Sequence, residues 1–248
     1  MHVYIYDSFL NQKKFKRLLA NLETRLTDLG LNGKTYRLGL LKNPKEMVDQ
    51  EIKKGAKTIV AVGNDKTVNQ IINSMAESNL AFGVIPIGEE DNQIAKSLGI
   101  NLTNACEILS ARRISKIDLA LANQYYFLAN ASIVSQETNL EINKNYTIEI
   151  SGRGEIKIVN LFTAEKSGER KFNSHPQDGQ LELLIKTKRV KNFLTQQTDQ
   201  SVFTIKKILV KNKKFLLLLD GVIKIATPAE VRVSKQKLRV IVGRERNF

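Results

Sequence analysis

The sequence predicts an α/β domain with a mostly parallel sheet, followed by an antiparallel β-sandwich. Up to about residue 120, short β-rich runs alternate with helical patterns of ten or more residues, as in βαβ units. Beyond that point almost every run is short and β-rich, with turn residues between the runs. The 248 residues are enough for two modest domains. We therefore expect domains at residues 1–120 and 121–248.

The first half contains the expected parallel strands and their helices. Strands are expected at residues 2–6, 34–38, 58–62 and 82–87. Helical patterns cover residues 13–29, 44–54, 67–78, a stretch ending at 98, and 101–113. Asn43 is expected to cap the second helix with Pro44 at its first position, and Thr67 to cap the third.

The second half reads almost entirely as strands. Expected strands lie at residues 117–122, 125–133, 146–151, 156–162, 181–186, 202–210, 215–219, 222–226, 231–233 and 238–242. Only residues 190–197 suggest a helix. Asp178-Gly179 and Asp220-Gly221 each lie between apolar runs, where Asp-Gly is a strong hairpin signal. A plain turn is the simpler interpretation of both pairs.

Composition and charge restrict the function. The longest apolar runs have about five residues, the N-terminus lacks the pattern of a signal peptide, and the single cysteine fits a reducing cytoplasm. The net charge is +14, of which +4 lies in residues 1–120 and +10 in residues 121–248. The basic second half favours an anionic partner, although a solubilising surface explains it equally well.

The composition argues against a nucleic acid as a specific partner. With 6% aromatic residues and no Trp, the chain lacks the stacking residues expected of a specific nucleic-acid binder. An exposed edge of the β-rich half could instead pair with a second copy of the chain, giving a homodimer.

Two loops follow successive expected strands. Residues 63–67 read Gly-Asn-Asp-Lys-Thr after the third strand, and residues 86–93 contain Gly88 and Asn92 after the fourth. Ligands of open α/β sheets bind beyond the carboxyl ends of the strands, so these loops could share one phosphate-binding crevice. Taken alone, the first loop is better explained as an ordinary βα turn, and a capped loop with solvated acidic residues explains the second at least as well.

Taken together and in order, these segments resemble the bacterial diacylglycerol kinase family, which is related to sphingosine kinases and more distantly to NAD kinases. That family carries Gly-Gly-Asp-Gly-Thr where residues 63–67 stand, and Pro-x-Gly-Thr-x-Asn-Asp-Phe-Ala-x-x-Leu-Gly where residues 86–99 stand. Residues 117–118 and 127–131 are similar to its crossing into a β domain. Residues 175–181 and 219–221 resemble its Asp-Gly-x-Leu and Asp-Gly-Glu loops.

The resemblance implies a nucleotide-binding α/β domain followed by a β-sandwich, and a cytoplasmic enzyme that works at the inner membrane face. It implies ATP and Mg²⁺ as cofactors and a lipid at an anionic membrane surface as substrate. Asp220 would be the general base that takes the proton of a lipid hydroxyl, and Asp178 would be associated with Mg²⁺. The nucleotide phosphates would contact Gly63, Asn64, Asp65, Lys66, Thr67, Gly88 and Asn92.

Several positions depart from the family pattern. Lys66 replaces a glycine, Glu89 and Glu90 stand near the family threonine, and Val222 replaces the glutamate of Asp-Gly-Glu. The Asn-Pro motif of the first loop is replaced by residues 6–9, Tyr-Asp-Ser-Phe. These departures support a second hypothesis, in which a degenerate relative binds a nucleotide, a lipid or a protein without catalysis.

Overall fold

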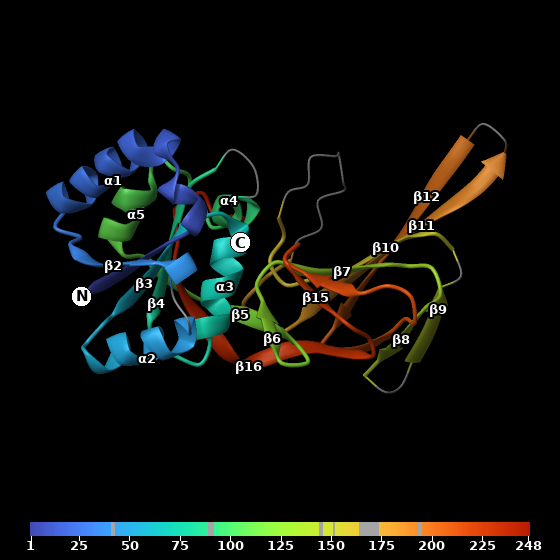
Figure 1. Ribbon diagram of the computed structural model, residues 1–248. Coiled ribbons are helices and arrows are strands. Elements are labelled where there is room, and N and C mark those ends of the chain that lie inside the picture. Colours follow the sequence, from blue (N-terminus) through green and yellow to red (C-terminus); the bar gives the residue numbers. More distant parts are fainter. Residues whose placement is uncertain (41–42, 89–91, 144–145, 151, 164–173, 193–194) are drawn as a thin grey trace. The chain divides into compact units, whose positions relative to one another are not determined.

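The computed structural model describes residues 1–248 except 41–42, 89–91, 144–145, 151, 164–173 and 193–194. The chain divides into two compact units (Figure 1). Unit 1 contains Met1–Ile117 and Gln236–Asn247, and unit 2 contains Asp118–Lys235 with Phe248. The α/β domain followed by antiparallel β structure confirms the predicted fold class. The boundary at residue 120 stays a prediction.

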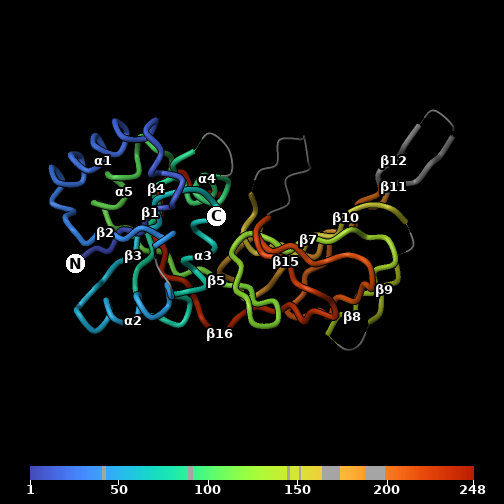
Figure 2. The backbone as a smooth tube through the Cα atoms, viewed as in Figure 1, coloured from blue at the N-terminus to red at the C-terminus, as the bar shows by residue number. Residues whose placement is uncertain are grey.

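Unit 1 is built on a parallel sheet in the order β2-β1-β3-β4, extended by the last residues of β16. Figure 2 traces β1, β3 and β4 side by side. The strands are β1 (His2–Tyr6), β2 (Gly33–Arg37), β3 (Thr58–Gly63), β4 (Ala81–Pro86) and β16 (Ala229–Ile241). β3 and β4 are buried along their whole length, as expected for parallel strands with helices on both faces.

The helices of unit 1 cover both faces of this sheet. α1 and α5 lie on one face, and α2 and α3 lie on the other (Figure 1). The helices are α1 (Lys16–Asp28), α2 (Pro44–Lys53), α3 (Asp65–Met75), α4 (Gln93–Ser97) and α5 (Ala105–Ala111), with 3₁₀ turns η1 (Ser8–Asn11), η2 (Lys13–Phe15) and η3 (Leu38–Leu40). The predicted start of α2 is confirmed: the Asn43 side chain accepts the Glu46 N–H, and Pro44 is the first helical residue.

Unit 2 contains two antiparallel layers. One follows the order β16-β13-β8-β9 and the other β12-β11-β10-β7-β14-β15, while β5 pairs with β16 and β6. Their bounds are β5 (Ile114–Ala122), β6 (Tyr125–Phe127), β7 (Asn130–Val134), β8 (Thr138–Ile142), β9 (Tyr146–Ile150), β10 (Gly154–Val159), β11 (Leu181–Asn192), β12 (Thr195–Ile205), β13 (Lys207–Lys211), β14 (Leu217–Leu219) and β15 (Ile223–Ile225). Strands of both layers contribute to one buried apolar cluster, which includes Phe127, Leu140, Ile156, Leu181 and Ile208.

The helix suggested for residues 190–197 is wrong. Residues 190–192 belong to β11 and residues 195–197 to β12, where Val190 pairs with Gln196 and Arg189 with Gln197. Pairing between the two strands supplies the backbone hydrogen bonds, and this tertiary context overrides a weak local helical pattern. Within the described residues, no helix has both the length and the hydropathy to cross a bilayer.

Candidate nucleotide site

The candidate nucleotide site of unit 1 lies where β1, β3 and β4 end. The loop after β3 leads into α3, and the loop after β4 leads into α4. Gly63 pairs with Pro86 at the ends of the two strands, and the Ile87 N–H donates to the Gly63 carbonyl over 2.9 Å. The two loops are therefore neighbours, as the parallel sheet predicts.

The start of α3 differs from the sequence-based expectation. Asn64, not Thr67, is the N-cap, and Thr67 is the third helical residue. The Asn64 Oδ1 accepts the N–H groups of Lys66 and Thr67, and the Thr67 hydroxyl accepts the Asn64 N–H, which makes a reciprocal capping box. Asn64 has φ −104° and Lys66 is helical, so both residues adopt ordinary backbone conformations that do not require glycine.

Gly63 is confined by the neighbouring side chains. A Cβ built on Gly63 would lie 3.0 Å from the Thr67 Cβ and 3.1 Å from the Asp7 Cβ, closer than ordinary carbon contacts. The glycine is needed here because the chain passes between these two side chains. Gly88, at φ +126°, is the second glycine of the site.

Asp65 ties the two loops together. Its carboxylate accepts the Gln93 N–H over 2.8 Å and the Ile94 N–H over 3.2 Å, so the first residue of α3 caps α4. Asn92 precedes α4, but its side chain turns back and donates to the Gly88 carbonyl over 2.8 Å. Glu89 and Glu90 lie outside the described residues.

Asp7 is a site residue that sequence reasoning missed. It follows β1, and its Oδ2 accepts the Thr67 hydroxyl over 2.6 Å, while its Oδ1 accepts the Phe9 N–H. The Asp7 N–H donates to the Val62 carbonyl, which fixes the residue beside the end of β3. The position where the family carries Asn-Pro thus holds a carboxylate close to the start of α3. The absence of Asn-Pro was the only sequence signal that could have drawn attention to it.

These contacts determine the electrostatics of the site. A helix N-terminus attracts anions because its N–H groups and dipole are positive. At α3 and α4, the N–H groups of Asn64, Lys66, Thr67, Gln93 and Ile94 donate to side chains of the protein itself. A phosphate that used these donors would have to displace the capping contacts or adjust to them.

Asp178 and Asp220 belong to unit 2. Asp220 and Gly221 have φ +46° and +69° and form the tight turn between β14 and β15, closed by the Val222 N–H donating to Leu219. The Asp220 carboxylate accepts three backbone N–H groups, from Leu128, Ala129 and Asn130, over 2.8–3.0 Å. Asp220 therefore connects this hairpin to the segment before β7.

Asp178 lies in a second turn of unit 2. Its Oδ1 accepts the Gln180 N–H, and the next residue, Gly179, donates to the buried Asp118 carboxylate over 2.8 Å. The buried Asn160 amide donates to the carbonyls of Asp118 and Leu128. Hydrogen bonds thus connect the segments that hold Asp178 and Asp220. Neither Asp118 nor Asn160 was assigned a role from sequence.

Glu182, near the start of β11, is also missed by sequence reasoning. Its side chain is only 7% exposed, and burial, together with the negative charge of Asp178, raises its pKa to about 7. Among the described residues, its Oε2 has no hydrogen-bond partner. Glu182 therefore exchanges a proton near neutral pH beside the residue matched to the family's magnesium aspartate.

Glu182→Gln is expected to make the protein less sensitive to pH. Because folding raises the pKa of Glu182 from 4.5 to about 7, the folded state binds this proton more tightly, and stability falls as pH rises through that window. The wild type should lose up to roughly 3 kcal/mol of unfolding free energy relative to Glu182→Gln between these limits. Urea unfolding at pH 4.5 and 7.5 measures the difference, with the exposed Glu149→Gln as control. Parallel pH profiles for wild type and Glu182→Gln would contradict this account.

Comparisons with known proteins agree with this architecture. Residues 2–122 match the family model described as the diacylglycerol kinase catalytic domain. The diacylglycerol kinase of Staphylococcus saprophyticus is 24% identical over 127 residues, which cover 50% of this chain and 42% of the relative. That of Staphylococcus haemolyticus is 25% identical over 127 residues, covering 50% of this chain and 38% of the relative. The matches thus span about two fifths of the length of these curated relatives.

Solved structures extend the likeness to both units. A crystal structure described as a diacylglycerol kinase from Bacillus anthracis superposes with a TM-score of 0.79 and 15% identity. The match covers 99% of this chain and 97% of that chain. At this identity the likeness shows the fold alone.

Proposed function

Because the chain belongs to the diacylglycerol-kinase-like family of lipid kinases, we propose that it transfers the γ-phosphate of ATP to a lipid hydroxyl. The donor would bind at the loops after β3 and β4 of unit 1. The acceptor would be a lipid presented at an anionic membrane surface, from the cytoplasmic side.

The observation that carries this proposal is the junction made by Asp65. Phosphoryl transfer depends mainly on positioning and on stabilising charge. By capping α4 from the first position of α3, Asp65 holds two family-matched segments together at adjacent strand ends. Lys66 is exposed next to it and would offset part of the phosphate charge.

Asp220 is the proposed general base. It would take the proton of the lipid hydroxyl as the hydroxyl oxygen bonds to the γ-phosphorus and the bond from that phosphorus to the bridging oxygen of ADP breaks. Three backbone N–H donors hold its carboxylate in one orientation and stabilise its negative charge. These hydrogen bonds support the position of the carboxylate, while they favour its ionised form and so lower its proton affinity.

The resemblance also implies Mg²⁺, with Asp178 as its residue. The part of the chain that the structure describes contains no group of three or more His, Cys, Asp or Glu side chains placed to hold a metal ion. Asp178 and Glu182 provide two nearby carboxyl groups, whereas Mg²⁺ usually takes one or two carboxylates together with substrate phosphates. These residues do not make a metal site by themselves, and we assign no step to a protein-bound ion.

The proposed partners follow from charge and topology. The balance of +10 in residues 121–248 would strengthen contact with an anionic membrane at roughly 1 kcal/mol per basic residue near the surface. A second copy remains a proposed partner, because β12 ends its sheet and carries the exposed Val202 and Phe203.

A second function is favoured by a specific observation. Asp7 places a carboxylate at the start of α3, and the capping box uses N–H groups that a phosphate would need. Both features suit a non-catalytic relative that binds a lipid or protein. In this alternative, the negative charge of Asp7 interacts with the positive N-terminal end of α3, as a phosphate would do in a kinase.

Calorimetric titration with ATP, with and without Mg²⁺, combined with phosphate transfer to diacylglycerol in mixed micelles, tests the proposal. The kinase predicts micromolar ATP binding and a phosphorylated lipid. Lys66→Ala should weaken ATP binding roughly threefold to tenfold, whereas Lys53→Ala, which removes an exposed charge from α2, should not. If no ATP heat and no labelled lipid are detected, the kinase proposal fails and the binding protein is favoured.

A further inference from the structure

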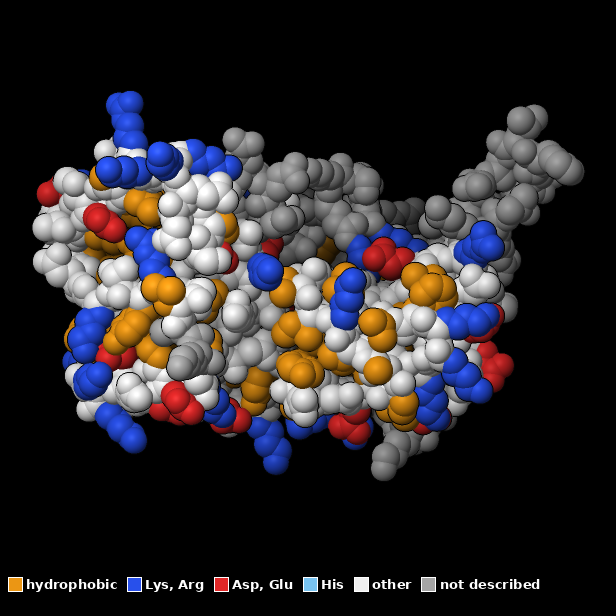
Figure 3. All heavy atoms as spheres, in the orientation of Figure 1, with side chains coloured by type: hydrophobic (Ala, Val, Ile, Leu, Met, Phe, Trp, Pro, Cys, Tyr) orange, Lys and Arg blue, Asp and Glu red, His pale blue; other side chains and the backbone are white. Residues whose placement is uncertain are grey.

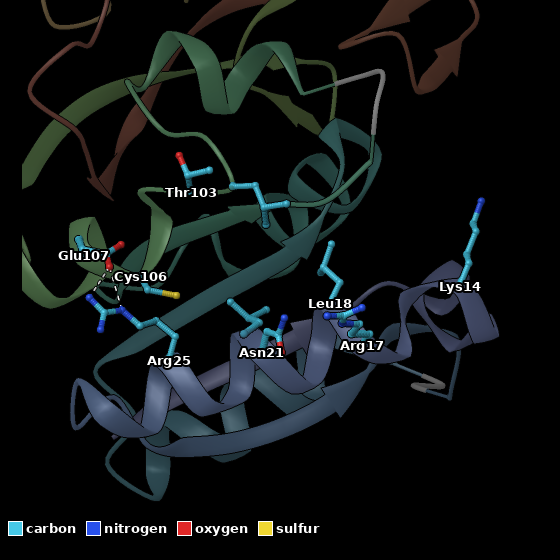
Figure 4. Close-up of a pocket in the computed structure, with 10 residues that line it drawn as sticks. Lys14, Arg17, Leu18, Asn21, Arg25, Thr103, Cys106 and Glu107 are labelled. Atoms are coloured by element: carbon cyan, nitrogen blue, oxygen red, sulfur yellow. Dashed lines mark hydrogen bonds and ion pairs between the residues drawn. The ribbon is translucent and has the colours of Figure 1, made fainter.

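Unit 1 has a groove whose lining residues do not include those of the loops after β3 and β4, and its size and lining suit a ligand. It lies between α1 and the segment that leads from residue 102 into α5, and its volume is about 710 Å³ (Figure 4). Pockets that bind small molecules have volumes of about 300–1,000 Å³. We call it the α1–α5 groove. Its lining residues are Lys14, Arg17, Leu18, Asn21, Leu22, Arg25, Leu102, Thr103, Cys106 and Glu107.

The floor of the α1–α5 groove is apolar. Leu18 and Leu22 lie one helical turn apart on α1, and Cys106 on α5 is 5% exposed. Leu102, which also lines the groove, is 40% exposed. The apolar floor would therefore gain from contact with a hydrocarbon chain.

The rim of the groove is basic. Lys14 and Arg17 are exposed, and none of the described acidic side chains forms an ion pair with them. The one acidic lining residue, Glu107, is bound by Arg25 over 2.7 Å. Figure 4 shows this ion pair at the opposite end of α1 from Lys14. Figure 3 shows Lys and Arg side chains gathered over the α1 region, with hydrophobic side chains beside them.

We propose that the α1–α5 groove binds an anionic amphiphile with a single hydrocarbon chain. The carboxylate or phosphate head would contact Lys14 and Arg17, and the chain would lie over Leu18, Leu22, Leu102 and Cys106. The groove contains three cationic side chains and a single carboxylate that is already paired, so the charge complementarity points to an anion. The apolar floor excludes a free inorganic anion as the best occupant, because such an ion would leave it uncovered.

The charged head and the hydrocarbon chain of the ligand are expected to contribute differently to the affinity. Contacts between exposed charges are weak, so the head should contribute less affinity than the hydrocarbon chain while still favouring an anion over a neutral group. Each further buried methylene should raise the affinity roughly threefold to fourfold until the groove is filled. Affinity should thus rise with chain length and differ between anionic and neutral heads.

Cys106 provides a local reporter, because it is the only cysteine of the chain and lines the groove. The experiment measures iodoacetamide modification of the full chain with dodecanoate, dodecyl phosphate or dodecanol below their critical micelle concentrations, alongside calorimetry. Both anions are expected to slow the modification and to bind with one-to-one stoichiometry. Dodecanol should bind at least roughly fivefold more weakly.

Two double variants with the same change of charge separate the groove from general basicity. Lys14→Glu with Arg17→Glu should weaken dodecanoate binding at least roughly tenfold and remove the protection of Cys106. Lys13→Glu with Lys16→Glu, on neighbouring exposed positions outside the lining, should stay within about twofold of the wild type. Circular dichroism checks that both variants are folded. Protection by dodecanol equal to that by dodecanoate, equal binding in the two variants, or binding to anionic vesicles without binding to the monomers would overturn the proposal.

Discussion

Replacing Asp220 with asparagine is expected to abolish phosphoryl transfer and to lower the free energy of unfolding by about 1–3 kcal/mol. Asn also tolerates the positive φ of the turn, so the hairpin should form. Its amide keeps one oxygen acceptor, but its NH₂ group would face one of the three N–H donors now held by the carboxylate. The variant should be folded but less stable than the wild type, and the amide at position 220 should be unable to act as a general base.

Asp220→Ala separates the structural role from the chemical role. Alanine removes all the acceptors and is strained at φ +46°, so we expect a larger loss of about 3–5 kcal/mol. Urea unfolding gives both stabilities, and lipid phosphorylation is measured at a temperature where Asp220→Asn remains folded. Undiminished turnover in Asp220→Asn would remove Asp220 as the base and leave it the structural role of joining the β14–β15 hairpin to residues 128–130.

Local signals explain which parts of the fold were predictable. Asn43-Pro44 and Asp220-Gly221 act through the backbone of their own neighbours, and the structure has the expected helix start and hairpin turn. The α/β-to-β change was visible because the hydrophobic period changes along the chain. The hairpin formed by β11 and β12 was missed at residues 190–197, because its hydrogen bonds come from pairing with a second strand.

The contacts that shape the candidate site join residues distant in sequence. Asp7 and Thr67 are 60 positions apart, and Asp65 caps a helix 28 positions further on. A spacing pattern identifies the loops but not which side chain of one loop reaches another. The Asn64 cap was readable in principle, since Asn is a favoured N-cap residue, but Thr67, another favoured N-cap type at the start of the helical pattern, was chosen instead.

Asp7→Asn is expected to raise the affinity for ATP roughly fivefold or more. The carboxylate lies 2.6 Å from the Thr67 hydroxyl, so a phosphate at the start of α3 would approach within roughly 4 Å of its charge. Repulsion at that distance costs roughly 1–4 kcal/mol between water-like and surface dielectrics. Asparagine keeps the shape and can still accept the Thr67 hydroxyl, at an expected stability cost of about 0.5–1.5 kcal/mol.

Calorimetry with ATP and with adenosine tests the electrostatic origin of this gain. Adenosine carries no phosphate, so its affinity should not change in Asp7→Asn, and the exposed Asp49→Asn on α2 controls for net charge. An equal gain for adenosine, or no gain for ATP, would show that Asp7 does not oppose a phosphate. If the wild type binds no ATP and Asp7→Asn does, the carboxylate is what blocks the site, and the non-catalytic function is favoured. If the wild type binds ATP with micromolar affinity and Asp7→Asn binds it more tightly, the site accepts phosphate despite Asp7, and the kinase is favoured.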